Sequence, residues 1–161
     1  MPQLTVWTNH GFSAAQTERL RSATQAELVF HAGGSSADAA TELRGADVAF
    51  GQPPVLAVLE SERLRWVQLS SAGYTSYDQP EVRRVFAARG AVLTKSSFVY
   101  SAPCAEHVLA LMLSWARRLP WALDAQRGER PWLHKLLRQN SVLLQGQRVV
   151  LVGFGSIGAR L

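Results

Sequence analysis

The stretch VVLVGFGSIGARL, residues 149–161, carries the sequence signal that is most informative about the fold. Residues 149–152 are a short, wholly apolar run rich in β-branched side chains, which is typical of a parallel strand buried on both faces. Gly153, Gly155 and Gly158 follow as G-x-G-x-x-G, whose glycines allow a tight turn, the approach of a pyrophosphate and close helix packing. The stretch therefore predicts a strand, a phosphate-binding turn and the start of a helix.

The nucleotide-binding unit that this turn begins is incomplete within 161 residues. Such a unit takes about 30 residues and carries an acidic residue about 20 positions after the glycines, which binds the ribose hydroxyls. Only Ala159, Arg160 and Leu161 follow Gly158. We therefore expect the sequence to be part of a longer protein. A glycine-rich turn without a ligand is the alternative interpretation.

The first 100 residues alternate strand and helix signals. Apolar, β-branched runs predict five strands, at residues 4–8, 27–32, 47–51, 64–70 and 91–96. The segments between them carry helix signals, and Ser13 is the predicted N-cap of the first helix. Strands that alternate with helices at this spacing predict an α/β domain over residues 1–101. We expect a flavodoxin-like, doubly wound parallel sheet with the strand order 2-1-3-4-5.

The composition is that of a globular protein, with 47% hydrophobic and 18% charged residues. The single cysteine, Cys104, excludes an internal disulfide framework. The amino terminus lacks the basic and apolar regions of a signal peptide. The uncharged apolar run at residues 108–116 is far shorter than the ~20 residues that a bilayer span needs. We therefore expect a cytoplasmic protein with no membrane contact.

Lysine and arginine exceed aspartate and glutamate by seventeen to twelve, which gives a net charge of +5. Nucleic-acid binding is one interpretation of such a charge. Much of the excess lies in residues 117–138, where Trp121 and Trp132 are separated by a proline and two acids and form no stacking platform. We expect a solvated basic surface near an anionic cofactor, and no nucleic-acid partner.

Residues 102–161 depart from the alternating pattern before them. The helix predicted over residues 102–119 is apolar on most of its circumference, which is typical of an interface between domains or between subunits. Residues 120–148 are a connection that leads into the strand and glycine turn of residues 149–161. We predict that residues 102–161 are the beginning of a Rossmann-type dinucleotide-binding domain.

The order of these features resembles the D-isomer-specific 2-hydroxyacid dehydrogenases. WVQLSSAGYTSYD (66–78) looks like the substrate-domain loop of that family. VLTKSSFVYSAPCAEHVLALMLSWARRLP (92–120) is similar to its crossover into the cofactor domain, and LLQGQRVVLVGFGSIG (143–158) to the first strand and turn of its NAD domain. The resemblance implies a two-domain, commonly homodimeric oxidoreductase that passes a hydride between NAD or NADP and a small 2-oxo or D-2-hydroxy acid.

The same resemblance implies site residues at matching positions. The backbone N–H groups of Ala72 and Gly73 would hold the substrate carboxylate, because successive amides in a turn form an anion-binding nest. Gln52 would line the substrate cleft. Ser101 would either touch the cofactor or cap the helix that follows it. The residues that would cradle the pyrophosphate are Gly153, Gly155, Ser156, Ile157 and Gly158.

Two features depart from the family pattern. Phe98 stands where many relatives have glycine, and the catalytic arginine, glutamate and histidine of the family lie beyond Leu161. The four histidines offer no evident substitute, because only Glu106 and His107 pair an acid with a base in sequence, and adjacent helical residues point about 100° apart. We expect no catalytic residue, no metal site and no dehydrogenase activity within these 161 residues. A short, non-catalytic carboxylate-binding or oligomerisation module is the alternative.

Overall fold

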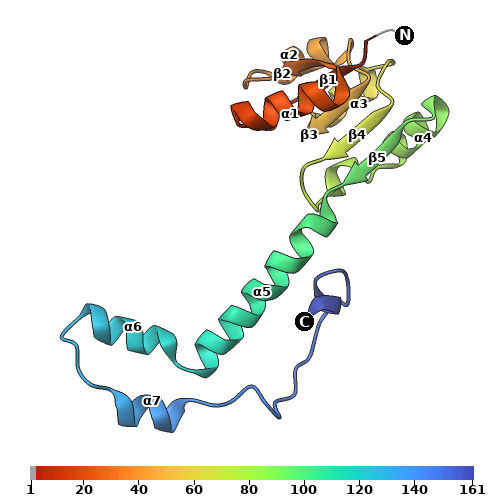
Figure 1. Ribbon diagram of the computed structural model, residues 1–161. Coiled ribbons are helices and arrows are strands. Elements are labelled where there is room, and N and C mark those ends of the chain that lie inside the picture. The colour runs from red at the N-terminus through yellow and green to blue at the C-terminus, as the bar shows by residue number, and fades with distance from the viewer. Residues whose placement is uncertain (1–2) are drawn as a thin grey trace. The chain divides into compact units, whose positions relative to one another are not determined.

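The computed structural model describes residues 3–161, which divide into two compact units. The first unit ends at Ser97, and the second runs from Phe98 to Leu161 (Figure 1). The division falls shortly before the boundary predicted after residue 101. That the second unit is the beginning of a cofactor domain stays a prediction.

The first unit is built on a parallel sheet of five strands. All neighbouring strands are parallel, and their order is β2-β1-β3-β4-β5, which confirms the predicted doubly wound class and strand order. Each strand lies inside its predicted run and is shorter than that run. The strands are β1 (Thr5–Thr8), β2 (Glu27–Phe30), β3 (Val48–Gly51), β4 (Trp66–Leu69) and β5 (Val92–Lys95).

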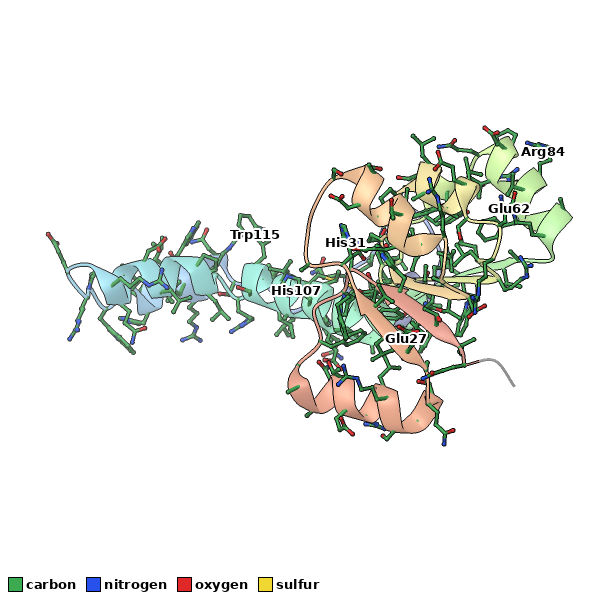
Figure 2. The ribbon with its side chains drawn as sticks, turned by 90° about the horizontal axis from the view of Figure 1, so that it is seen from above. Glu27, His31, Glu62, Arg84, His107 and Trp115 are labelled. Carbon is green, nitrogen blue, oxygen red and sulfur yellow. The ribbon has the colours of Figure 1, made fainter. Side chains whose placement is uncertain are left out.

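Four helices connect these strands and cover both faces of the sheet. Helix α1 lies on one face, and α2, α3 and α4 lie on the opposite face (Figure 2). Ser13 caps α1 as predicted: its hydroxyl accepts the N–H of Gln16, and the Gln16 side chain accepts the N–H of Ser13. The bounds are α1 (Ala14–Thr24), α2 (Ser36–Leu43), α3 (Val55–Glu60) and α4 (Pro80–Arg89).

The hydrophobic core of this unit lies between the sheet and helices α2, α3 and α4. Its fully buried members include Trp7 of β1, Leu43 of α2, Val58 of α3 and Leu69 of β4. Helix α1 contributes no buried residue. The core therefore fixes the strands and the three helices of one face, and the loops at the carboxyl ends of the strands are held by this frame.

An ion pair ties the start of β3 to the loop before β4. The Asp47 carboxylate accepts hydrogen bonds from Arg63 at 2.8 and 3.0 Å and from the backbone N–H of Thr5 at 2.9 Å. The hydrogen bond from Arg63 is the main reason that the pKa of Asp47 lies below its ordinary value. The same contact raises the pKa of Arg63.

Because folding lowers the pKa of Asp47, we expect the protein to lose stability in acid. A carboxyl group whose pKa is lowered by folding stabilises the protein above its unfolded pKa of about 4, and that contribution is lost as the pH falls through the folded pKa. We expect the free energy of unfolding to fall less between pH 5 and pH 3 in Asp47→Asn than in the wild type. Urea unfolding at the two pH values measures this. Asp124→Asn, which changes an exposed carboxyl group, is the control, and equal acid losses in wild type and Asp47→Asn would contradict the assignment.

The second unit contains three α-helices among its described residues. They are α5 (Ser97–Ala116), which begins at the last residue of the first unit, α6 (Leu119–Arg127) and α7 (His134–Asn140). Helix α5 begins earlier than the predicted helix at residues 102–119, and the predicted connection contains α6 and α7. No helix within residues 3–161 is long and apolar enough to cross a membrane.

The strand expected at residues 149–152 is not formed, and this expectation was wrong for the chain as it stands. Figure 1 shows coil between α7 and a short turn at the carboxyl end, and the side chains of Val150 and Val152 are 86% and 100% exposed. A parallel strand needs a neighbouring strand to accept and donate its backbone hydrogen bonds, and the described residues 98–161 contain none. The helix expected after the glycine turn is likewise replaced by a single 3₁₀ turn, Gly158–Arg160.

Candidate functional site

Three segments of the first unit meet at the carboxyl end of its sheet. Asn9 follows β1, Gln52 follows β3, and residues 70–74 follow β4. Strand β1 pairs with β2 on one side and with β3 on the other, so the direction in which the sheet grows reverses at β1. In sheets of this kind, ligands bind outside the carboxyl ends of the strands where the order reverses. The position therefore favours a small-molecule site.

The loop after β4 carries the two predicted carboxylate-binding residues. Ala72 and Gly73 are exposed, and their backbone N–H groups donate to no atom of the described residues 3–161. The Ser71 hydroxyl donates to the carbonyl of Gly73 at 2.9 Å, and the N–H of Ser96 donates to the carbonyl of Ser71 at 3.0 Å. The carbonyls of Ser71 and Gly73 thus accept hydrogen bonds from the protein, whereas the consecutive N–H groups of Ala72 and Gly73 are open to an anion.

Gln52 lies beside this loop. Its side-chain Nε2 donates to the Ser71 hydroxyl at 3.0 Å. Its backbone N–H donates to Oδ1 of Asn9 at 2.8 Å, and Nδ2 of Asn9 donates to its carbonyl at 2.9 Å. The structure brings Gln52 together with the predicted nest, although its role as a lining residue of a cleft stays a prediction. Asn9 was not identified from the sequence, because it lies 43 positions before Gln52 and no sequence pattern indicates that the two residues are in contact.

Two further groups border the loop. Nζ of Lys95 lies 4.2 Å from the ring centroid of Tyr74, which places a positive charge over the side chain that follows Gly73. The hydroxyl of Tyr77 donates to the carbonyl of Pro53 at 2.6 Å and joins the segment after β4 to the segment after β3. Burial raises the pKa of Tyr77 to about 12, so this hydroxyl remains a neutral donor at physiological pH.

The predicted pyrophosphate residues form a glycine turn in the second unit. Gly153 has φ +95°, a conformation that favours glycine, and a Cβ on Gly158 would lie 3.0 Å from the carbonyl oxygen of Gly153. The N–H of Ala159 donates to the carbonyl of Gly155 at 3.0 Å. The glycine pattern thus fits a tight turn, as predicted. The strand and helix that would frame a phosphate site are not formed, so the roles of Gly153, Gly155, Ser156, Ile157 and Gly158 stay predictions.

Ser101 lies inside α5, four residues after the first helical residue, and is 2% exposed. The alternative in which Ser101 caps the helix after it is therefore wrong. Residues 97–101 belong to the first turns of α5, so Ser101 lies past the start of the helix. Contact of Ser101 with a cofactor stays a prediction.

One histidine has a carboxylate partner that sequence spacing did not reveal. Nδ1 of His31 lies 2.9 Å from Oε2 of Glu42, and Nε1 of Trp7 donates to the same oxygen at 2.8 Å. His31 follows β2 and lies beneath helix α2, as Figure 2 shows. The contact depends on how α2 packs on the sheet, which spacing cannot show. By contrast, Glu106 and His107 are both exposed on α5.

The basic segment of residues 117–138 is partly used in the packing of the second unit. The guanidinium of Arg118 lies over the rings of Trp115 and Trp121, at 5.4 and 5.2 Å from their centroids, and donates to the carbonyl of Asn140 at 2.8 Å. This arginine therefore stabilises the α5–α6–α7 arrangement. Within residues 3–161, no group of three or more histidine, cysteine, aspartate or glutamate side chains is placed to hold a metal ion.

Comparisons with known proteins identify relatives by structure. No protein-family model and no curated protein matches the chain. A NADPH-dependent glyoxylate/hydroxypyruvate reductase from Sinorhizobium meliloti, solved in complex with NADP and malonate, is 25% identical with a TM-score of 0.68. The match covers 98% of this chain and 48% of that one.

Two more distant structures share the fold. A D-mandelate dehydrogenase from Rhodotorula graminis is 16% identical with a TM-score of 0.78, over 99% of this chain and 51% of that one. A 2-hydroxyacid dehydrogenase from Ketogulonicigenium vulgare is 18% identical with a TM-score of 0.65, over 99% and 50%.

The fold defines the class of this protein as an α/β protein with a doubly wound parallel sheet. More narrowly, its fold is that of the 2-hydroxyacid dehydrogenases, which confirms the resemblance seen in the sequence. The chain spans about half the length of the structures that it matches.

Proposed function

We propose that this chain is the amino-terminal part of an NAD(P)-dependent oxidoreductase that interconverts a small 2-oxo acid and a D-2-hydroxy acid by hydride transfer. The observation that carries the proposal is the structural likeness, over 98% of the chain, to a reductase solved with NADP and malonate. The open amides of Ala72 and Gly73 at the carboxyl end of the sheet support it. A non-catalytic module of this size has no comparable support.

The first unit would bind and orient the acid. The N–H groups of Ala72 and Gly73 would donate to the substrate carboxylate, and the charge of Lys95 would favour the anion. With its carboxylate held on these amides, the acid would keep its 2-oxo carbon free to react. The reduced cofactor, NADH or NADPH, would supply the hydride to that carbon. In our proposal a proton donor and an arginine located beyond Leu161 complete the reaction at the carbonyl oxygen, so this chain contributes binding and no catalytic residue.

The glycine turn would hold the cofactor pyrophosphate through the residues from Gly153 to Gly158. Its glycines fit the close approach of a ligand, because no atom lies within 4 Å of a Cβ built on Gly153 or Gly155. In the proposed whole protein, additional strands would pair with residues 149–152 and extend the turn into a helix. We also propose that the whole protein is cytoplasmic and that it is a homodimer, the latter as the resemblance implies.

The mass and activity of the protein from its native source test this proposal. We expect an intact mass roughly twice that of the 161-residue chain, since the relatives are about twice as long. We also expect oxidation of NADH or NADPH, followed at 340 nm, when glyoxylate or hydroxypyruvate is added.

Acetaldehyde, which has a carbonyl group but no carboxylate, is the matched control substrate. It should support little turnover, because it has nothing to place on the amides of Ala72 and Gly73. A native protein of 161 residues that oxidises neither cofactor would overturn the proposal. Equal turnover of glyoxylate and acetaldehyde would leave the oxidoreductase but remove the carboxylate nest from its mechanism.

A further inference from the structure

We propose that Asn9 is a positioning residue for the carboxylate-binding loop of residues 70–74, and that it acts through Gln52 and Ser71. This inference rests on the proposed function for its ligand, although its geometry does not depend on that function. Asn9, Gln52 and Ser71 follow three different strands, β1, β3 and β4, which lie side by side in the sheet. A continuous set of hydrogen bonds joins them.

The first link is a two-point contact between the Asn9 side chain and the Gln52 backbone. Oδ1 of Asn9 accepts the N–H of Gln52 at 2.8 Å, and Nδ2 of Asn9 donates to the carbonyl of the same residue at 2.9 Å. A carboxamide that satisfies both groups of one residue fixes that residue in position and orientation, much as a neighbouring strand would. The contact therefore fixes the path of the backbone directly after β3.

The backbone before Gln52 is shaped for this contact. Gly51 has φ +128°, and a Cβ built there would collide with Oδ1 of Asn9. The absence of a side chain at residue 51 therefore lets the Asn9 carboxamide lie directly against the chain. Residues 9 and 51 form a matched pair, in which the glycine provides the space and the asparagine provides the hydrogen bonds.

The second link runs from Gln52 to the nest. Nε2 of Gln52 donates to Oγ of Ser71 at 3.0 Å, and Oγ of Ser71 donates to the carbonyl of Gly73 at 2.9 Å. Each hydroxyl has one proton, so the donor from Gln52 directs the proton of Ser71 towards Gly73. The bond to Gly73 closes the loop on itself, and the amides of Ala72 and Gly73 stay together as one binding surface.

Asparagine is the side chain that this position requires. Aspartate would keep an acceptor for the N–H of Gln52, but its second oxygen would face the Gln52 carbonyl without a donor. It would also add a negative charge to a segment that adjoins the carboxylate site. Alanine would remove both contacts. The two substitutions therefore separate the acceptor role of Asn9 from its donor role.

Hydrogen exchange in the 161-residue chain, without a ligand, tests the first link. In Asn9→Ala we expect the Gln52 amide to exchange about tenfold faster and the amides of Ala72 and Gly73 to become more mobile in ¹⁵N relaxation. In Asn9→Asp we expect the Gln52 amide to stay protected while the loop loosens. Unchanged relaxation of the loop in both variants would overturn the inference, whether or not any ligand binds.

A malonate titration, followed through the amide signals of Ala72 and Gly73, tests the consequence for binding. We expect the dissociation constant to rise about tenfold in Asn9→Ala, which corresponds to the loss of roughly one hydrogen bond. Sodium chloride at the same ionic strength controls for salt effects. If malonate shifts neither amide in the wild type, the proposed function fails, and the relaxation measurement still decides the role of Asn9.

Two further variants keep the test independent of folding. Asn140→Ala removes a similar side-chain bond, from Nδ2 of Asn140 to the carbonyl of Leu136 at 2.8 Å, in the other unit, and should change neither measurement. Ser71→Ala leaves Asn9 and Gln52 in place and breaks the second link alone. If Asn9→Ala does not fold, Ser71→Ala should still loosen Ala72 and Gly73 and weaken malonate binding. A Ser71→Ala chain with wild-type loop order and affinity would overturn the proposed relay.

Discussion

Replacing Gly51 with alanine should lower the free energy of unfolding of the first unit by about 3 kcal/mol or unfold it outright. Gly51 is buried and has φ +128°, a conformation that residues with a side chain rarely adopt. The strained backbone alone costs about 1–3 kcal/mol. The new Cβ would also force Asn9 away from Gln52, with the loss of two hydrogen bonds worth about 0.5–1.5 kcal/mol each. Urea unfolding, followed through the NMR signal of the Trp7 indole N–H in the core, measures the loss.

Gly11→Ala is the matched control for this substitution. Gly11 lies in the loop after β1, its φ is outside the left-handed region, and no atom lies within 4 Å of a Cβ built there. We expect its effect to stay within about 0.5 kcal/mol. A Gly51→Ala protein with the wild-type urea midpoint would show that the chain can turn after β3 without a glycine, and the pairing of residues 9 and 51 would be refuted.

The sheet of the first unit could be predicted because its signals are local. Each strand is a short apolar run between polar or glycine-containing segments, and the helix cap at Ser13 is recognisable from residue type alone. The order of the strands followed from the general rules for alternating strands and helices. The strands are shorter than the predicted runs, because hydrogen bonding to neighbouring strands, and not the apolar pattern, sets the strand ends.

The parts that could not be predicted depend on contacts between distant residues. The pairing of Asn9 with Gln52 and that of His31 with Glu42 arise only when the strands and helices are packed. At residues 149–152 the local pattern was that of a strand, but a strand forms only against a partner. The local signal at this segment is the same in an isolated chain and in a complete sheet, so the sequence alone could not predict that it remains coil.

Replacing Gly73 with aspartate should weaken carboxylate binding about 100-fold without unfolding the protein. No atom lies within 4 Å of a Cβ built on Gly73, and its φ is not left-handed, so a side chain can be added there. The new carboxylate would lie beside the open amides of Ala72 and Gly73. Two like charges about 4 Å apart repel by about 4 kcal/mol at an effective dielectric constant near 20, and salt lowers this value. We therefore expect the malonate affinity of the chain to fall about 100-fold, or roughly 2.7 kcal/mol.

Gly73→Asn separates charge from size in this experiment. It adds a side chain of the same shape without the charge, and the Ser71 hydroxyl can still donate to the backbone carbonyl of residue 73. We expect Asn to weaken malonate binding much less than Asp, and both variants to keep the wild-type urea midpoint. Equal losses in the two variants would mean that bulk alone blocks the loop. Wild-type affinity in Gly73→Asp would place the acid elsewhere on the chain, because a carboxylate bound to these amides could not tolerate a second negative charge in direct contact.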